Sequence, residues 1–414
     1  MDDASRWACL YPDLVRLIGW RVLAGDLLDY VRFRAVCPLW RSSTVCPLGR
    51  GLVDERFHPR LWVLLPEGRA LFPGHSELHG YVRFFNLSTG LSVRARLPLF
   101  EDHRILDSVD GLVLLLQERD GAIRLLHPFT GDIAELPPLS TLVSDFAAKS
   151  KLSSIWDLSD FRKISATSVS VSSDGLITVM ILLSMMGHVA FATTSGGIDR
   201  QWSVSSWSLS PMWRSVSFQG RLYILQRSGY NSSNPQILQI DPPHHDKEII
   251  SPPKLIATCP GKIQPPYHLV QCDSDVLAIG CSDKPNSLHL LVYRLADLIL
   301  NKFTPVESIG GNVLFANIER SLSVSARALP TIVGDTIVKL KPRDIHLGEY
   351  HLKGATWLRT TDESTCGLEP SHSNLIHRIF WCHHNRDRKQ TYFLGDSTPR
   401  LVRRNWRDEV HIPL

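Results

Sequence analysis

The chain has 414 residues, of which 43% are hydrophobic and 21% are charged. This length exceeds the ~150 residues of one typical domain, so we expect more than one domain. A formal net charge of +4 is too small to indicate a nucleic-acid-binding protein. The eight cysteines have no framework spacing and no apolar leader precedes them, which predicts free thiols in an intracellular protein of the nucleus or cytoplasm.

Residues 12–44 have the spacing of three short helices. Pro12 suits the first turn of a helix, and apolar residues then recur at three- and four-residue steps as far as Val22. Asp26 can cap a second helix that carries the apolar residues Leu27, Leu28, Val31 and Ala35. Pro38 begins a third helix, which ends near Thr44.

Three short helices in fewer than ~50 residues cannot enclose a full core. We therefore expect some of their apolar side chains to face outward, toward a partner. The alternative is a helical cap that packs on the domain that follows.

From about residue 58 onward, short apolar runs alternate with turns rich in Gly, Asp, Asn and Pro. This pattern predicts successive β-hairpins, and we expect no long amphipathic helix among them. The run from Leu176 to Ala192 is shorter than the ~20 residues of a membrane-spanning helix, and Gly187-His188 interrupts it. It predicts two buried strands around a turn, and no membrane span.

One internal repeat is visible. Phe84–Gly90 and Leu125–Gly131 share an apolar strand end, a Thr-Gly turn and a following Leu-Pro, and the two glycines are 41 residues apart. Propeller blades repeat at about 40–50 residues, which gives six to eight blades for a body of this size. The alternative is a pair of similar turns in some other all-β fold.

The N-terminal residues resemble an F-box, the helical module that binds a Skp-type adaptor of a cullin ubiquitin ligase. The resemblance lies in Leu10-Tyr11-Pro12, in the apolar helix from Leu14 to Val22, and in the stretch Val36 to Arg41. Tyr11 and Pro38 depart from the family pattern. The resemblance implies adaptor contacts at six positions, with Trp40 as a binding hot spot: Pro12, Leu14, Ile18, Val36, Cys37 and Trp40.

The body is similar to that of plant, grass-type F-box proteins with a C-terminal KIB-type β-propeller. The likeness covers roughly residues 60–345 and is carried by residues 107–131, 216–223 and 293–326. With the N-terminal resemblance, it implies an α+β multidomain chain with an F-box at 1–48, a linker at 49–60 and an antiparallel β-propeller at 61–345. The likeness fades after Ile345, and for the C-terminal segment at 346–414 three alternatives stay open: it finishes the propeller, closes it with a terminal strand, or extends partly free of it.

The two resemblances imply a substrate-recognition subunit of a Skp–cullin–F-box ubiquitin ligase. Its partners would be the adaptor, a cullin held through it, and a target protein on the propeller; no nucleic acid, membrane or cofactor is implied. One alternative is a protein-interaction scaffold, or decayed paralogue, without a role in ubiquitination. Another is an enzyme or ligand-binding propeller with a helical cap.

Motifs for catalysis are missing from the sequence. There is no glycine-rich phosphate loop, Walker lysine or nucleophile elbow. Six Cys and His residues near the C-terminus are competent zinc ligands but lack a close Cys-x-x-Cys pair: Cys366, His372, His377, Cys382, His383 and His384. We expect a strand through Ile379–Trp381 that places Cys382 on a packed face. No metal and no enzymatic activity are predicted.

Overall fold

A computed structural model describes residues 10–67, 73, 75–117, 119–149, 163–183, 186–194, 201–209, 213–227, 234–243, 250–283, 289–317, 320–340, 347–359, 375–380 and 382. Three helices come first: α2 (Pro12–Gly25), α3 (Leu27–Ala35) and α4 (Pro38–Ser43). The helical spacing is confirmed, including Pro12 in the first turn of α2. Asp26 caps α3 as predicted, because its side chain accepts from the amides of Leu28 and Asp29.

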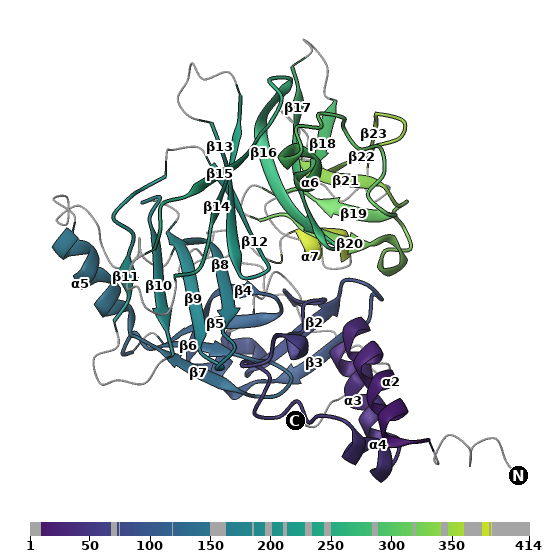
Figure 1. The fold of residues 1–414 in the computed structure, drawn as a ribbon. Helices are drawn as coiled ribbons and strands as arrows, with labels where there is room; N and C mark the ends of the chain where they lie inside the picture. The colour runs from purple at the N-terminus through teal and green to yellow at the C-terminus, as the bar shows by residue number, and fades with distance from the viewer. Residues whose placement is uncertain are drawn as a thin grey trace, which may run out of the picture.

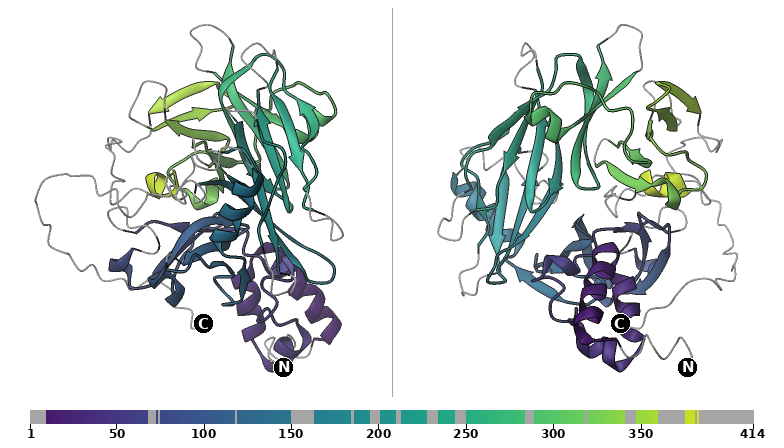
Figure 2. Two further views of the ribbon diagram at one scale, coloured as in Figure 1. Left: turned by 90° about the vertical axis from the view of Figure 1, so that its left-hand side faces the viewer. Right: turned by 45° about the vertical axis from the view of Figure 1, so that its right-hand side comes forward.

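Six β-sheets follow in chain order (Figures 1 and 2), and they form a six-bladed propeller. The first has β1 (Trp62–Leu65), β2 (Tyr81–Asn86) and β3 (Ser92–Arg96). The second has β4 (His103–Val109), β5 (Leu112–Gln117), β6 (Ile123–Leu126) and β7 (Ile133–Leu136). The third has β8 (Ile164–Val171), β9 (Ile177–Leu183), β10 (Val189–Thr193) and β11 (Ser203–Val204).

The fourth sheet has β12 (Trp213–Phe218), β13 (Arg221–Gln226), β14 (Gln236–Ile240) and β15 (Lys254–Thr258). The fifth has β16 (Ile263–Cys272), β17 (Asp275–Ser282) and β18 (Leu290–Arg294), followed by α6 (Leu295–Ile299). The sixth has β19 (Asn312–Phe315), β20 (Leu322–Ser325), β21 (Thr336–Leu340), β22 (Leu347–His351) and β23 (Thr356–Arg359). It therefore extends past residue 345.

The core consists of apolar layers between neighbouring sheets. One such layer joins each consecutive pair, and one more joins the sixth sheet back to the first. Strand β9 contributes to two of these layers, because Val179 and Ile181 face the second sheet while Met180 and Leu182 face the fourth. A strand buried on both faces reads as a continuous apolar run. The two strands predicted within residues 176–192 are confirmed as β9 and β10.

The sixth and first sheets meet through several contacts that close the ring. Helix α7 (Leu375–Phe380) packs Ile376, Ile379 and Phe380 into the layer between these sheets. The Nε of Arg378 donates to the carbonyl oxygen of Pro66 at 3.0 Å, and Asn317 donates to the carbonyl of Phe380 at 2.8 Å. Helix α7 thus links the first and the sixth sheet of the propeller.

Two expectations about the body were wrong. The predicted strand through Ile379 is helix α7, whose apolar residues recur at helical spacing. An amphipathic helix, which was not expected in this region, is also present. Helix α5 (Leu139–Lys149) connects the second and third sheets and buries Leu139, Leu142 and Phe146 in the core layer between them. The antiparallel propeller is confirmed, and its sixth sheet includes one parallel pair, β19 with β21, because β20 comes between them in the sequence.

Candidate functional site: the N-terminal helices and the channel mouth

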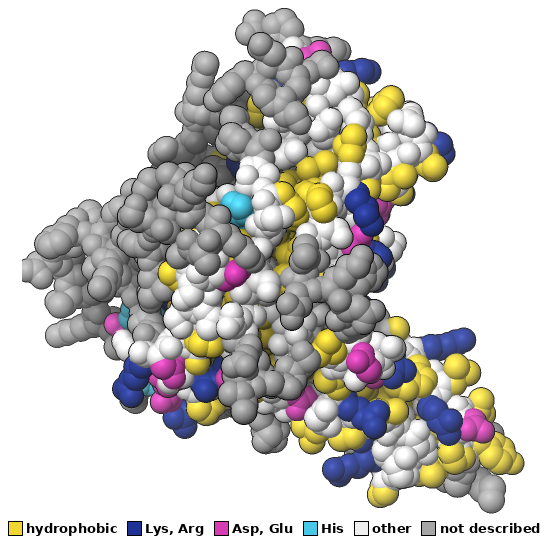
Figure 3. All heavy atoms as spheres, turned by 60° about the vertical axis from the view of Figure 1, so that its left-hand side comes forward, with side chains coloured by type: hydrophobic (Ala, Val, Ile, Leu, Met, Phe, Trp, Pro, Cys, Tyr) yellow, Lys and Arg dark blue, Asp and Glu magenta, His cyan; other side chains and the backbone are white. Residues whose placement is uncertain are grey.

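The helical module (residues 12–44) has an outer face with apolar side chains exposed to solvent. Leu14 is 46% exposed and Leu17 is 52% exposed on α2, while Val31 is 39% exposed on α3 and Val36, just after α3, is 62% exposed. Figure 3 shows the module projecting from the body, with apolar and basic side chains interspersed on its surface. An exposed apolar stripe on a short helix is typical of a surface that binds a partner.

The six positions implied by the F-box resemblance do not form one equivalent set. Pro12, Leu14 and Val36 are exposed, while Ile18 and Cys37 are half-buried. Trp40 is only 9% exposed, and its ring packs against that of Phe33 at a tilt of 30°, with centroids 4.3 Å apart. The Sγ of Cys37 accepts from the Trp40 amide at 3.5 Å and so caps α4. Trp40 therefore packs in the interior of the helical module and stabilises it.

Two further residues of the helices, Leu17 and Val31, are exposed as well. Leu17 and Val31 belong to the apolar spacing that predicted the helices, but the motif does not include them. The apolar spacing in the sequence predicts the helices. Which of the apolar side chains stay exposed depends on how the helices pack, and the spacing alone does not show this.

The inner face of the module is sealed against the first two sheets. Leu28 enters the core layer between those sheets, and Leu23, Leu27 and Tyr30 pack around Phe57. The guanidinium of Arg56 lies 4.3 Å from the centroid of the Trp20 ring, a cation–π contact. The module is thus both a cap on the propeller and a helical unit with an open outer face.

Asp26 is the polar centre of this junction. Its Oδ1 accepts from the amide of Leu28 at 2.8 Å and caps α3. Its Oδ2 accepts from Nε1 of Trp62 at 2.7 Å and from Nδ2 of Asn86 at 2.9 Å. One carboxylate therefore joins the start of α3 to strands β1 and β2.

The predicted repeat is a pair of equivalent turns, and both contact the N-terminal region. Asn86 and His127 each accept from two backbone amides of their own turn through a side-chain atom. Asn86 then donates to Asp26, while Nε2 of His127 lies 3.0 Å from the carbonyl oxygen of Phe57. Burial lowers the pKa of His127, so its ring stays neutral in this contact.

The linker is held at the second turn. Asp132, which follows Gly131, accepts from the amide of Gly49 at 3.0 Å and from that of Gly51 at 2.7 Å. Gly51 is closely packed, because a Cβ on it would lie 2.4 Å from Oγ1 of Thr130. The residues between the helices and the propeller are therefore bonded to the body.

A cavity of about 1140 Å³ occupies the centre of the propeller and opens beside the helices. Its wall is formed by the innermost strands together with the end of α2 and residues 55–60. Arg320 crosses part of this space from the sixth sheet and donates to the Ser108 carbonyl and the Asp107 carboxylate of the second. The mouth thus combines surfaces of both the helices and the propeller.

Tight turns at the ends of inner strands form a second repeat, and those at Asp110 and Asp273 line this cavity. Asp110, Gln219 and Asp273 have φ near +50°, each followed by Gly or Ser. Gly111 is required, because a Cβ there would lie 2.0 Å from the carbonyl oxygen of Pro59. Burial raises the pKa of Asp110. The sequence signal for these turns is a polar dipeptide after a strand, which is Asp-Gly, Gln-Gly or Asp-Ser.

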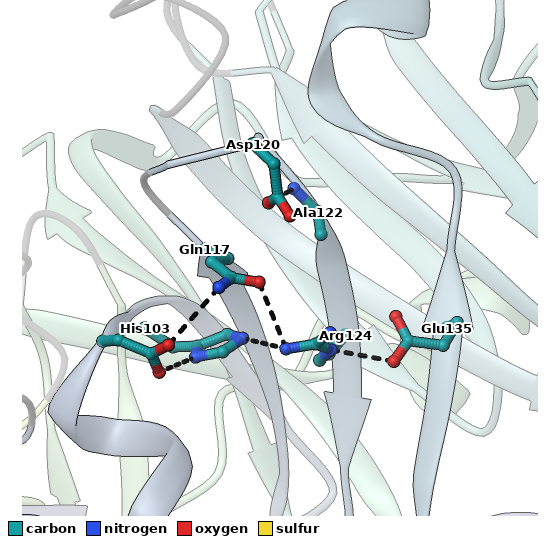
Figure 4. Close-up of polar contacts among 7 residues, drawn as sticks. His103, Gln117, Asp120, Ala122, Arg124 and Glu135 are labelled. Atoms are coloured by element: carbon teal, nitrogen blue, oxygen red, sulfur yellow. Dashed lines mark hydrogen bonds and ion pairs between the residues drawn. The ribbon is translucent and has the colours of Figure 1, made fainter.

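The second sheet contains a polar network with an Asp–His pair (Figure 4). Nδ1 of His103 lies 2.5 Å from Asp102, and its Nε2 lies 2.6 Å from Nη1 of Arg124. Arg124 also donates through Nε to Glu135 at 2.8 Å. Because the guanidinium occupies Nε2, this imidazole has no free nitrogen with which to act as a general base.

No group of three or more potential metal-ligating side chains occurs among the described residues. Of the six zinc candidates, Cys366, His372, His383 and His384 lie outside the described residues, as does the side chain of His377. Burial raises the pKa of the Cys382 thiol to about 12, which disfavours the thiolate that binds metal. None of the helices within the described part of the chain is long and apolar enough to cross a membrane.

A family model, the KIB1-4 beta-propeller, matches residues 84–354. The chain belongs to the KIB1-4 β-propeller family. The match begins within β2, so the helices and the linker lie outside it. No curated protein matches the chain by sequence.

Three solved structures resemble the chain distantly. The Cps50 (Swd1) β-propeller of Myceliophteria thermophila has 11% identity and a TM-score of 0.27, over 67% of this chain and 76% of that one. Extracellular domains 1–2 of Drosophila semaphorin 1b have 10% identity and a TM-score of 0.25, over 69% and 63%. A bifunctional GH43-CE protein of Bacteroides eggerthii has 9% identity and a TM-score of 0.21, over 60% and 30%. The fold assignment rests on the six sheets and the family match.

Proposed function

We propose that this KIB1-4 propeller protein is the substrate-recognition subunit of a Skp–cullin–F-box ubiquitin ligase. The observation that carries the proposal is the outer face of the helices, where Leu14, Leu17 and Val36 are exposed beside an F-box-like sequence. A Skp-type adaptor would cover this face. The propeller, a protein-interaction domain, would bind the target protein.

The mechanism is proximity. The adaptor and cullin would bring a charged ubiquitin-conjugating enzyme close to a target lysine held by the propeller. Raising the effective concentration of two reactants accelerates their reaction without a catalytic group from the receptor. In this proposal the chain is a non-enzymatic subunit, without a cofactor, that acts in the nucleus or cytoplasm.

A binding experiment on the full chain tests the proposal. In the double variant Leu14→Asp/Leu17→Asp, two charges replace exposed apolar contacts, and we expect co-purification with a Skp-type adaptor to be lost. Loss of buried apolar contacts at an interface centre costs about 2 kcal/mol or more, about thirtyfold in Kd. The matched control is Leu358→Asp on β23, because Leu358 and Leu17 are both 52% exposed. Unchanged adaptor binding by the double variant would contradict the proposal.

A second experiment separates a ligase receptor from a scaffold that binds the adaptor without directing ubiquitination. Reconstitution with adaptor, cullin, activating and conjugating enzymes should give ubiquitin transfer that depends on Leu14 and Leu17. Adaptor binding without any transfer would favour the scaffold.

A further inference from the structure

The carboxylate of Asp26 makes two kinds of contact, one with its own helix and one with the propeller. Oδ1 bonds the first amides of α3, as an ordinary N-cap does. Oδ2 bonds Trp62 and Asn86, which belong to the propeller. Trp62 is 2% exposed and Asn86 is 1% exposed, so both donors are buried at the junction.

We propose that Asp26 is a positioning residue that holds the helical module in one orientation on the propeller. A partner on the Leu14 and Leu17 face would then stand at a fixed place relative to a target on the propeller. The second statement rests on the proposed function, whereas the first rests only on the contacts at the junction.

The surroundings of Asp26 explain why its loss would change orientation more than folding. The apolar contacts of Leu28 with the first sheets remain without the carboxylate. The buried N–H groups of Trp62 and Asn86, however, would lose their acceptor, and an unsatisfied buried donor is costly. The junction would shift or admit water to satisfy them.

The variant Asp26→Ser separates the two roles of this residue. Serine is a good N-cap, so α3 keeps its capped start. Its shorter side chain cannot place a second oxygen between Trp62 and Asn86. The matched control is Asp241→Ser, because Asp241 accepts from Arg221, Gln239 and Lys254 next to the fourth sheet, away from the helices.

The orientation is measured first, on the full chain without any partner. Nitroxides introduced as unnatural amino acids at Ser42 and Arg119, both exposed, report the distance from α4 to the second sheet by pulsed electron resonance. We expect one narrow distance distribution for the wild type and for Asp241→Ser. For Asp26→Ser we expect a distribution at least about twofold broader, or a shifted one. A distribution in Asp26→Ser equal to that of the wild type would overturn the proposal.

The functional consequence is measured second, in the reconstituted ligase. Mass spectrometry maps which lysines of the chain itself receive ubiquitin. A fixed orientation predicts a small set of preferred lysines in the wild type and a more even spread in Asp26→Ser, with adaptor Kd unchanged to within about twofold. An identical lysine pattern in the two proteins would overturn this part. If the wild type binds no adaptor, the proposed function fails, while the distance measurement still decides the role of Asp26.

Discussion

At the scale of single residues, the same sequence motif places side chains in opposite environments. Leu14 and Val36 are exposed, whereas Trp40 is buried against Phe33. The aromatic ring that the F-box resemblance implies as a contact residue therefore stabilises the three helices. Its truncation would test folding, and the exposed leucines are the appropriate residues for testing binding.

We expect Trp40→Ala to lower the free energy of unfolding by about 3 kcal/mol, because a buried aromatic side chain leaves a cavity. Leu14→Ala, at an exposed position, should change it by less than about 0.5 kcal/mol. Urea denaturation followed by circular dichroism measures both. Equal effects of the two substitutions would show that Trp40 does not pack inside the module.

Buried histidines make stability depend on pH. Burial lowers the pKa of His58 to about 4 and that of His268 to about 3. Between pH 6.5 and these values the unfolded chain binds protons that the folded chain does not, so the free energy of unfolding falls as the pH falls.

For His58 alone, the loss between pH 7 and pH 5 should be about 2 kcal/mol. His58→Gln can keep a donor toward the carbonyl of Leu52, which lies 3.3 Å from Nε2, but does not titrate. Denaturation curves at the two pH values should therefore show a smaller loss in this variant. An equal loss in variant and wild type would mean that His58 does not contribute.

At the scale of elements, the repeated turns are alike in backbone and different in surroundings. Gly90 and Gly131 have φ of +77° and +74°. A Cβ on Gly90 would lie 3.0 Å from the carbonyl oxygen of Ala328, whereas nothing lies within 4 Å of a Cβ on Gly131. The first turn therefore packs against the short helical turn that follows β20, whereas a side chain on the second turn would meet open space.

Gly90 and Gly131 allow a controlled comparison, because they share a backbone conformation and differ in what surrounds them. Gly131→Ala should cost about 1 kcal/mol, the penalty for a side chain at positive φ. Gly90→Ala should cost more, by about 1 kcal/mol or above, because Ala328 must also move. Thermal unfolding of the two variants measures the difference. Equal costs would indicate that the first turn and Ala328 are not in contact.

The elements also show what the sequence could and could not predict. Pro12, Asp26 and Pro38 mark helix starts through local chemistry, so the three helices were predictable. Hairpins such as β5 and β6 were predictable from Asp120-Gly121 between apolar runs. Helices α5 and α7 were missed, because a few apolar residues at helical spacing within a strand-rich region look like strands. The second role of Asp26 depends on Trp62 and Asn86, 36 and 60 residues away, and no local pattern reports that.

At the scale of the whole molecule, the ring closes through contacts between the first sheet, the sixth sheet and α7. Apolar layers join all six neighbouring pairs of sheets, and α7 completes the layer between the sixth and the first. This arrangement could not be read from the sequence, because it pairs residues near 65 with residues near 380.

Ile379→Ala should therefore destabilise the whole propeller and not only helix α7. Ile379 is 1% exposed, and such a truncation costs about 2–4 kcal/mol. Ile299→Ala, at a side chain that is 49% exposed on α6, serves as the control with a small effect. Hydrogen exchange should show faster opening in both the first and the sixth sheets of the variant. Faster exchange in α7 alone would contradict closure by this helix.

The most direct test of the account is a calorimetric titration of the full-length chain with a Skp-type adaptor. We predict saturable binding of one adaptor per chain, with a negative heat-capacity change because the apolar face of the helices is buried. We also predict that Leu14→Asp/Leu17→Asp removes the binding while Leu358→Asp preserves it. Absence of binding by the wild-type chain would contradict the account and leave a KIB1-4 propeller whose helices serve only as a cap.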